Sequence, residues 1–412
     1  MLDYHIHTLP NGIRIVHKQV LHTKIAHSGF ILDLGSRDEQ PDQLGLAHFW
    51  EHMAFKGTAK RKSFHILNRL ESVGGELNAY TTKEKLCFYS SVLDKHFEKS
   101  FELLTDITFH SIFPEKEIEK ERGVILEEMA MYLDTPEEAI VDEFDNVVFD
   151  NHPLGNNILG TKESVSGFKK DDFQRFIKDN LSTEALVFCS VSNLPFEKVV
   201  KLAEKYLADI PTISKPRQRV AFENYTPKAV TFEKPISQAH CVIGCPAYAL
   251  NDDRRIPFFM LVNLLGGPGM NSRLNLAVRE KHGLVYTIDA NYATYIDTGL
   301  LSIYFGTEKK QLKRTTSLVL KELKKLREKQ LGSLQLHTAK EQLMGQLAMA
   351  EESNMGLMMM MGKSILDQGH IDTLNEIFDQ IKNTTAQDLI DIANDVLREE
   401  KLSFLNYVPV NG

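Results

Sequence analysis

Residues 44–58, LGLAHFWEHMAFKGT, are the stretch on which the interpretation of the whole chain depends. The pattern predicts a helix that ends at Gly57. His48 and His52 are four residues apart, so their imidazoles project from one face of this helix, and Glu51 lies close to that face. Most of their neighbours are apolar. These polar groups therefore need partners, because a buried polar group without one costs about 1–3 kcal/mol.

A zinc ion would satisfy all three side chains. The order H-x-x-E-H is the reversed form of a zinc-peptidase signature. A pattern of five residues can also arise by chance in a chain of 412 residues. The interpretation therefore needs a third ligand at a suitable place and a strand on which a peptide can dock.

Length and composition limit the class of protein. The 412 residues predict about two to three domains with a large core. Hydrophobic residues make up 42% and charged residues 25%, as is typical of soluble globular proteins. The net charge of −8 argues against a protein that binds nucleic acid through phosphate contacts. With neither a signal-peptide pattern nor 18 uninterrupted apolar residues, we expect a cytoplasmic protein that does not associate with membranes.

The four cysteines form no CxxC pair, and their surroundings are typical of strand cores: Cys87, Cys189, Cys241 and Cys245. The simplest interpretation is that they are free buried thiols in a reducing compartment.

The first half of the chain alternates between strand and helix patterns. Strands are expected at 4–8, 13–17, 25–34 and 184–191, with one or two more from Gly74 to Val92. Helices are expected at 63–73, 95–111, from Pro114 to about Pro136, directly after Pro136, at 171–180 and at 196–208. These patterns predict one domain at residues 1–212. An irregular segment with several prolines follows and predicts a linker at 213–230.

The remaining residues, 231–412, resemble the first half at an offset of about 208 residues, which indicates an internal repeat. Strands are expected at 238–248, 284–292 and 299–306, and helices at 255–265, 272–281, 308–329, 333–353, 355–367 and 385–397. Helix 255–265 takes the place of the histidine-bearing helix but contains no histidine. The four methionines at 358–361 predict a buried helix surface. The predicted fold class is α+β, with two homologous α/β domains, each an antiparallel-rich sheet packed with helices.

Three motifs in this order resemble a known family. HFWEH at 48–52, NAYTTKE at 78–84 and ERGVILEE at 121–128 are together similar to the inverted-motif zinc peptidases, which include pitrilysin, insulin-degrading enzyme and the processing peptidases. The length and the repeat resemble the half-size processing-peptidase branch. The resemblance implies a zinc-dependent metalloendopeptidase with one Zn²⁺ per chain, acting on flexible or presequence-like peptides. Trp50 departs from the family, where many relatives carry an aliphatic residue, and we expect it to reshape the pocket wall.

The resemblance also implies the metal ligands. They are His48, His52 and a glutamate far downstream, at the position of Glu128. Glu127 is the rival for the third ligand. It points about 100° away on the helix, whereas Glu128 shares the face of Glu121, seven residues earlier. Glu128 is therefore the predicted ligand.

Further roles are carried over in the same way. Glu51 is implied as the general base, and Glu121 as a second catalytic glutamate that supports the ligands. Asn78 and Ala79 match the segment where a peptide adds to the sheet as an extra strand. From the residues alone, Asn78 can also be a turn residue after the preceding glycines.

Arg279 and Tyr286 in the second half match an arginine and a tyrosine that bind the substrate backbone in the family. Because a half-size chain would receive these groups from a second subunit, we expect a homodimer that encloses a chamber. One alternative is a catalytic subunit that is active only with a zinc-free homologue. Another is a non-catalytic scaffold member of the same fold.

Overall fold

The computed structural model describes residues 4–410, which divide into two compact units. Unit 1 comprises residues up to 129 together with 156–219 and 349–371. Unit 2 comprises 130–155, 220–348 and the residues from 372 onward. Both units combine helices with a mostly antiparallel sheet, which confirms the predicted fold class. Within residues 4–410, every helix is too short or too polar to cross a membrane.

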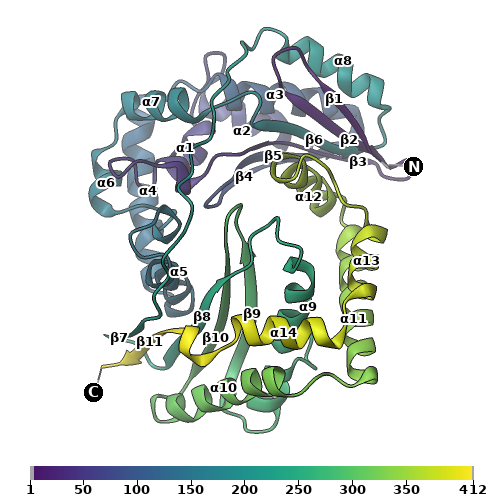
Figure 1. The fold of residues 1–412 in the computed structure, drawn as a ribbon. Coiled ribbons are helices and arrows are strands. Elements are labelled where there is room, and N and C mark those ends of the chain that lie inside the picture. The colour runs from purple at the N-terminus through teal and green to yellow at the C-terminus, as the bar shows by residue number, and fades with distance from the viewer. Residues whose placement is uncertain (1–3, 411–412) are drawn as a thin grey trace. The chain divides into compact units, whose positions relative to one another are not determined.

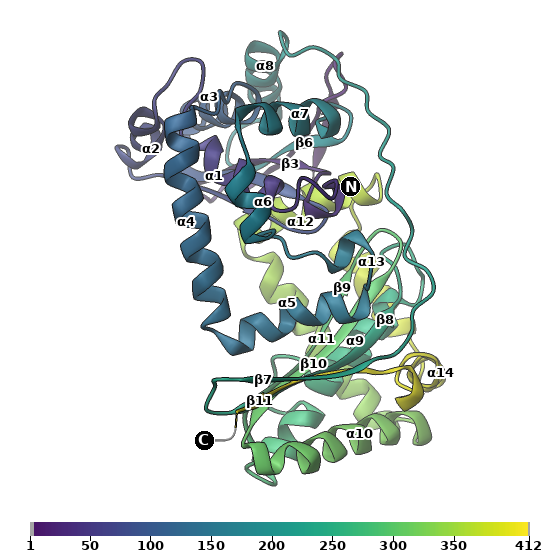
Figure 2. The ribbon, with the colours of Figure 1, turned by 90° about the vertical axis from the view of Figure 1, so that its left-hand side faces the viewer.

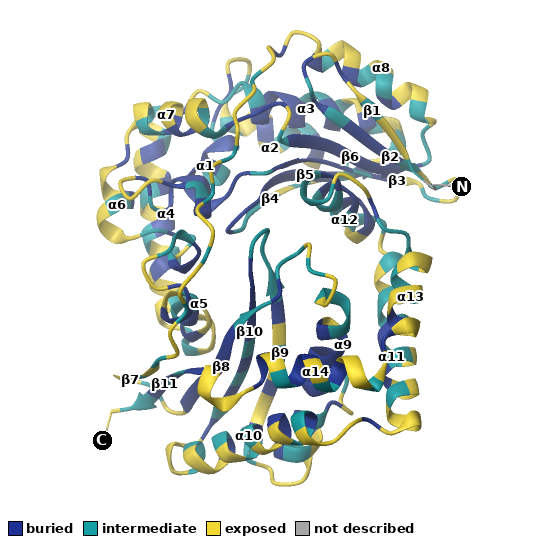
Figure 3. Ribbon diagram, viewed as in Figure 1, coloured by how far each residue is buried: buried dark blue, intermediate teal, exposed yellow. Residues whose placement is uncertain are grey.

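Unit 1 is built on a six-stranded sheet in the order β1-β2-β6-β3-β5-β4 (Figure 1). Its strands are β1 (His5–Thr8), β2 (Arg14–Gln19), β3 (Ile25–Leu32), β4 (Glu76–Thr81), β5 (Leu86–Leu93) and β6 (Leu186–Ser192). Its helices are α1 (Leu46–Ala54), α2 (Ser63–Glu71), α3 (Phe97–Phe109), most of α4 (Glu115–Leu133), α6 (Lys162–Gly167), α7 (Lys170–Asn180), α8 (Phe196–Leu207) and α12 (Asn354–Asp367). Strand β4 forms one edge of the described sheet. In Figure 3 it is less buried than its neighbour β5.

Aromatic side chains fill the face of this sheet that α3 covers. Phe30, Phe88 and Phe188 lie opposite one another in the register of β3, β5 and β6, and all three are fully buried. Phe101 of α3 packs on this row, with 4.2 Å between its ring centroid and that of Phe188. Burial of one such side chain contributes about 1.5–3 kcal/mol, so the row stabilises both the strand register and the position of α3.

The opposite face of the sheet is covered by α12, which comes from the second half of the sequence. Successive side chains of a strand point to opposite faces of the sheet. The immediate neighbours of the three phenylalanines therefore point toward α12: Ile31, Cys87 and Cys189. The methionine run 358–361 packs on them, in agreement with the predicted buried helix. A Cβ on Gly362 would lie 2.3 Å from Ile31 Cδ1, so this close approach requires glycine. All four cysteines are free and buried, as predicted.

Unit 2 repeats the topology of unit 1. Its sheet has the order β7-β11-β8-β10-β9, which matches β2-β6-β3-β5-β4, including the parallel first pair. Its strands are β7 (Ala229–Lys234), β8 (Ala239–Ala247), β9 (Val285–Thr294), β10 (Gly299–Thr307) and β11 (Ser403–Pro409). Its helices are α5 (Pro136–Val148), α9 (Arg255–Gly266), the π-helical turn η4 (Asn275–Glu280), α10 (Leu312–Glu328), most of α11 (Ser333–Glu351), α13 (Leu374–Asn383) and α14 (Ala386–Val396). The shared strand order supports the predicted repeat.

Two helices do not follow the division predicted from the sequence. Helix α5, which lies before the predicted boundary, packs on β8 and β11 of unit 2 (Figure 2). Helix α12, which lies after that boundary, packs on β3 and β6 of unit 1. Each carries an apolar stripe, and that stripe is buried on a sheet formed by the other half of the chain. The compact units therefore differ from the predicted ranges 1–212 and 231–412 at these two helices.

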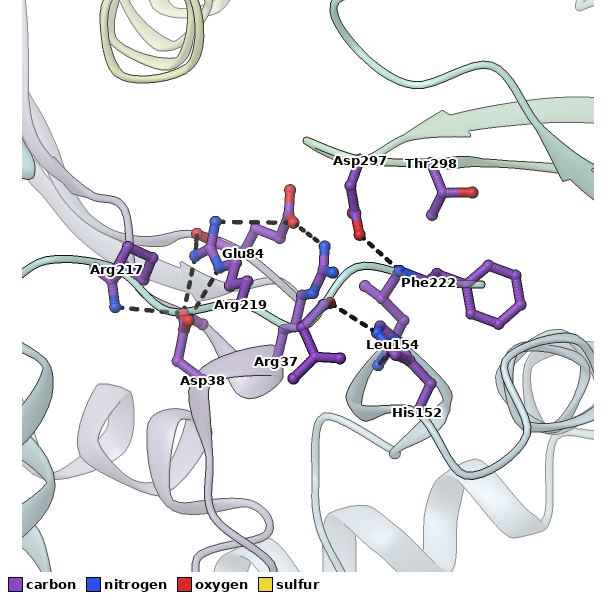
Figure 4. Close-up of polar contacts among 12 residues, drawn as sticks. Arg37, Asp38, Glu84, His152, Leu154, Arg217, Arg219, Phe222, Asp297 and Thr298 are labelled. Atoms are coloured by element: carbon purple, nitrogen blue, oxygen red, sulfur yellow. Dashed lines mark hydrogen bonds and ion pairs between the residues drawn. The ribbon is translucent and has the colours of Figure 1, made fainter. Parts of the chain in front are cut away.

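Arginines in the first half of the predicted linker are held in unit 1 by buried ion pairs (Figure 4). Arg219 donates from Nε and Nη2 to the two carboxylate oxygens of Asp38, at 2.9 and 2.8 Å, and its Nη1 lies 3.0 Å from Asp33 Oδ1. Beside them, Arg37 donates to Glu84 at 2.6 Å. Burial alone would raise the pKa of Asp33, but the surrounding lysine and arginines outweigh it, so that pKa lies below its ordinary value. The chain is thus fixed to unit 1 as far as Arg219.

Candidate metal centre

A buried carboxylate fixes the start of α1. Gly45 precedes the helix with a φ of 91°, a conformation that favours glycine. Glu39 Oε2 and Oε1 accept hydrogen bonds from the backbone N–H groups of Gly45 and Ala47, each at 2.8 Å. These donors have no partner inside the helix. Burial raises the pKa of Glu39 to about 8, although the two N–H groups oppose this change.

Aromatic residues between the histidines anchor α1 in the core. Phe49 packs on Phe173 of α7, with ring centroids 5.1 Å apart. Trp50 is fully buried between Phe88 of β5 and Phe176 of α7. Trp50 is therefore a core residue, which corrects the expectation that it reshapes the wall of a pocket. Because these rings fill one side of α1, the polar face is held toward α4.

The two histidines lie together on that polar face. The ring centroids of His48 and His52 are 4.7 Å apart, as the spacing of four residues predicts. Burial, followed by the repulsion of His52, lowers the pKa of His48 to about 3. His48 is therefore neutral at physiological pH, and neutral imidazole is the form that binds a metal ion.

Glu128 of α4 completes the cluster. Its Oε2 lies 3.7 Å from His48 Nε2 and 3.6 Å from His52 Nε2. Across residues 4–410, this is the one group of three or more histidine, cysteine or acidic side chains whose ligand atoms converge, all within 4.8 Å of one another. Glu127 is exposed and stands outside the cluster. The geometry thus brings together the three predicted ligands and leaves out the rival.

The donor set fits a zinc ion. Two imidazole nitrogens and one carboxylate oxygen are ligands that zinc prefers. With metal–ligand bonds of about 2.0–2.1 Å in a tetrahedral site, neighbouring ligand atoms would lie about 3.4 Å from one another. The observed contacts of 3.6 and 3.7 Å are close to that spacing and longer than a normal hydrogen bond. The spacing is therefore suited to a cation held between the groups.

Glu121 contacts His52, while its predicted catalytic role stays a prediction. Its Oε2 lies 3.3 Å from His52 Nδ1, and its Oε1 lies 2.6 Å from Lys56 Nζ. Burial acts to raise the pKa of Glu121, but the hydrogen bonds from His52 and Lys56 outweigh it and leave that pKa below its ordinary value. An ionised Glu121 that accepts from Nδ1 leaves Nε2 of His52 free to face Glu128.

Glu51 lies half-buried between α1 and the edge strand β4. Its Oε2 accepts a hydrogen bond from the hydroxyl of Thr81 at 2.6 Å. Burial raises the pKa of Glu51, and the hydrogen bond from Thr81 acts in the opposite direction. A carboxylate with a raised pKa next to a candidate metal site is suited to accept and return a proton.

The predicted docking residues lie on β4. Asn78 pairs with Tyr89 and Ala79 with Phe88 in the register of β4 and β5. Asn78 therefore lies within a strand, which excludes the turn alternative. The other side of β4 is an edge of the described sheet, and such an edge can accept an added strand.

Arg279 and Tyr286, the predicted substrate-binding residues of the second half of the chain, lie next to each other in unit 2. Arg279, in η4, holds its guanidinium 5.8 Å from the ring centroid of Tyr286 at the start of β9. Tyr286 is 86% exposed, which is unusual for a tyrosine. Their roles toward a substrate stay a prediction.

Sequence reasoning did not identify three residues that shape this site. Glu39 caps α1, Lys56 pairs with Glu121, and Thr81 bonds to Glu51. For Thr81, its place inside the motif at 78–84 was the one feature of the sequence that could have indicated a role in the site. The contacts of Glu39 and Lys56 depend on tertiary packing.

Comparison with known proteins places the chain in a family. Residues 14–162 match the insulinase family, peptidase family M16, and residues 167–343 match the M16 inactive domain. The chain is 33% identical over 394 residues to YmxG of Bacillus subtilis, described as an uncharacterized zinc protease, covering 96% of both proteins. It is 32% identical to an uncharacterized zinc protease of Streptomyces coelicolor, covering 97% of this chain and 88% of that protein.

Solved structures share the fold at lower identity. A protease from Helicobacter pylori superimposes with a TM-score of 0.90 at 19% identity, covering 98% of this chain and 99% of that one. A structure from Pseudomonas fluorescens, described as a peptidase M16 inactive domain, gives a TM-score of 0.93 at 17% identity, covering 100% and 99%. The two family-model matches and the 33% identity to the Bacillus subtilis protein establish that the chain belongs to the insulinase family of zinc peptidases, peptidase family M16.

Proposed function

We propose that this chain is a zinc-dependent endopeptidase that binds one Zn²⁺ through His48, His52 and Glu128. The observation that carries the proposal is the convergence of these three ligand atoms from α1 and α4, with Glu51 next to His52. Zinc in such a site polarises a peptide carbonyl and makes water a nucleophile near neutral pH.

The residues around the metal site have separate tasks in this proposal. Glu51 takes a proton from the attacking water and returns it to the leaving amine, for which its burial and raised pKa are suitable. Glu121 holds His52 through Nδ1 and keeps its ring in the ligand orientation.

A flexible peptide is the substrate that the edge strand favours. A segment that adds to β4 beside Asn78 and Ala79 would bond mainly through its backbone, so recognition would depend little on sequence. Most backbone groups of a folded protein are already hydrogen-bonded within it, so a flexible peptide is better suited to this docking. Presequence-like oligopeptides therefore fall within the proposed range.

The active form in this proposal is a homodimer that encloses a chamber. Arg279 and Tyr286 of one subunit would bind the substrate backbone at the metal site of the other and stabilise the developing oxyanion. The exposed Tyr286, with Arg279 beside its ring, supports this role. The four buried free thiols are consistent with a reducing compartment such as the cytoplasm.

Peptide hydrolysis by the purified chain tests the proposal. A mixed library of quenched fluorescent peptides should be cleaved, a chelator should abolish cleavage, and added zinc should restore it. The Glu51→Gln protein should keep one zinc ion by metal analysis but lose activity, whereas Glu127→Gln, altered at an exposed neighbour of the ligand, should keep both. Cleavage that persists after complete removal of zinc would contradict the proposal.

Mixing variants tests the shared site. Glu51→Gln and Arg279→Ala subunits should each be poorly active, and mixed dimers should regain part of the activity. Confirmed mixed dimers without any regain would argue against sharing. Activity that appears only with a zinc-free homologue would establish the heterodimer instead.

A further inference from the structure

Thr81 occupies a position where the edge strand meets the proposed general base. It is the last residue of β4, and its backbone pairs with Leu86 of β5. Its hydroxyl donates to Glu51 Oε2 at 2.6 Å, a distance typical of a strong bond to a carboxylate. The bond joins two elements, since Glu51 lies on α1 and α1 packs on β4.

The alternation of β4 assigns the side chains around this bond to two faces. Tyr80 points toward α12, where its hydroxyl contacts Met359 Sδ at 3.7 Å. Ala79 and Thr81 therefore point to the opposite face, the one on which α1 lies. The strand that carries the predicted docking residues thus also carries the hydroxyl that holds Glu51.

The bond limits how Glu51 can orient. A glutamate side chain has three rotatable bonds, and only one of its oxygens is engaged by Thr81. Threonine is branched at Cβ and stiff at χ1, so its hydroxyl is a well-placed donor. With Oε2 held in this way, Oε1 remains available for a proton.

We propose that Thr81 is a positioning residue that aligns Glu51 for proton transfer and links that alignment to the strand on which the peptide docks. This inference rests on the proposed function, because it assigns Thr81 a task in that reaction. Thr81 does not itself touch the ligand atoms, so its loss should leave zinc binding unchanged.

Three substitutions test the role. Thr81→Val keeps the shape and removes the hydroxyl, Thr81→Ser keeps the hydroxyl, and Thr81→Ala is a second variant without it. We expect kcat to fall by about 10- to 100-fold in Thr81→Val and Thr81→Ala, as for the loss of one hydrogen bond to a charged group, with KM within about twofold. Thr81→Ser should recover most of kcat. An unchanged kcat in both variants without the hydroxyl would overturn the proposal.

Two further measurements do not depend on activity. In crystal structures of the zinc-bound variants, the carboxylate of Glu51 should be displaced in Thr81→Val and remain in place in Thr81→Ser. An undisplaced Glu51 in Thr81→Val would overturn the positioning role even if no peptide is ever found to be cleaved. Zinc affinity, from competition with a chelator, should be the same in all variants, and a loss in Thr81→Val would assign Thr81 to the metal site instead. Failure of the proposed function would appear differently, as an inactive wild-type protein.

Discussion

Substitution of Glu121 by glutamine should weaken zinc binding without removing a ligand. The carboxylate of Glu121 is almost fully buried and divides its oxygens between His52 Nδ1, at 3.3 Å, and Lys56 Nζ, at 2.6 Å. A glutamine keeps one acceptor oxygen. Its amide group must then face either the imidazole N–H or the ammonium group, and both of these are donors. The substitution therefore breaks one contact and removes the charge that favours the ligand orientation of His52.

The size of this effect follows from the type of contact. Loss of an outer partner of a metal-binding histidine reduces metal affinity by about 10- to 100-fold. This corresponds to about 1.4–2.8 kcal/mol. Because Glu121→Gln loses the charge and one of the two contacts, we expect a reduction of about 30-fold, within that range. Glu121→Ala, which loses both contacts, should lie at its upper end.

Competition with a chromogenic chelator measures the zinc affinity directly, and thermal unfolding with and without zinc provides an independent readout. Glu127→Gln is the matched control because it alters an exposed glutamate on the same helix and should bind zinc like the wild type. If the zinc affinity of folded Glu121→Gln stayed within twofold of that of the wild type, the contact between Glu121 and His52 would not be what orients this ligand.

Three further predictions concern the ligand, the anchored linker and the cap of α1. Glu128→Gln should bind less than one zinc ion per chain by elemental analysis when one equivalent is supplied. The substitution replaces a charged carboxylate, whose Oε2 lies within 3.7 Å of both imidazoles, by a neutral amide. Arg219→Ala should lower the free energy of unfolding in urea by about 3 kcal/mol, because buried Asp38 would be left with its longer contact with the cation of Arg217, at 3.6 Å; a change below about 1 kcal/mol would contradict this. The folded-state pKa of Glu39, about 8, lies above its ordinary value of 4.5, so its stabilising contribution is complete below pH 4.5 and is lost as the pH rises through 8. The stability of the wild type relative to Glu39→Gln should therefore decrease over this range in urea titrations at several pH values.

Two of the three candidate ligands could be predicted from the sequence alone because their arrangement is local. The spacing of His48 and His52 on one helical face depends only on helix geometry, and the apolar neighbours show that the face is buried. Glu128 lies on another helix, and periodicity alone does not connect the two elements. The resemblance supplied this connection, and the structure brings the three groups together.

Other contacts could not be predicted because they depend on tertiary packing. Glu39 lies in a polar loop, and nothing in its neighbourhood indicates that it folds back onto the start of α1. Strands β7 and β11 went unpredicted, since β7 is largely exposed and β11 pairs only with strands that are distant in the sequence. Helices α5 and α12 have ordinary amphipathic patterns that define an apolar face but not the sheet that covers it.

The internal repeat indicates how the fold accommodates a polar site. Helix α9 follows β8 as α1 follows β3, and the buried face of α9 is formed largely by apolar side chains. Helix α1 instead places His48 and Glu51 in a largely buried setting, and His48 Nδ1 and Trp50 Nε1 are buried without a hydrogen-bond partner. Such atoms destabilise a fold by about 1–3 kcal/mol each. The contacts that surround α1 oppose this cost: the Glu39 cap, the aromatic anchors on α7 and the bond from Thr81. Helix α9 also has aromatic contacts, of Phe258 with Tyr248 and Tyr292, but no comparable polar face. The Glu39 cap and the bond from Thr81 are therefore best explained by the requirements of the proposed metal site.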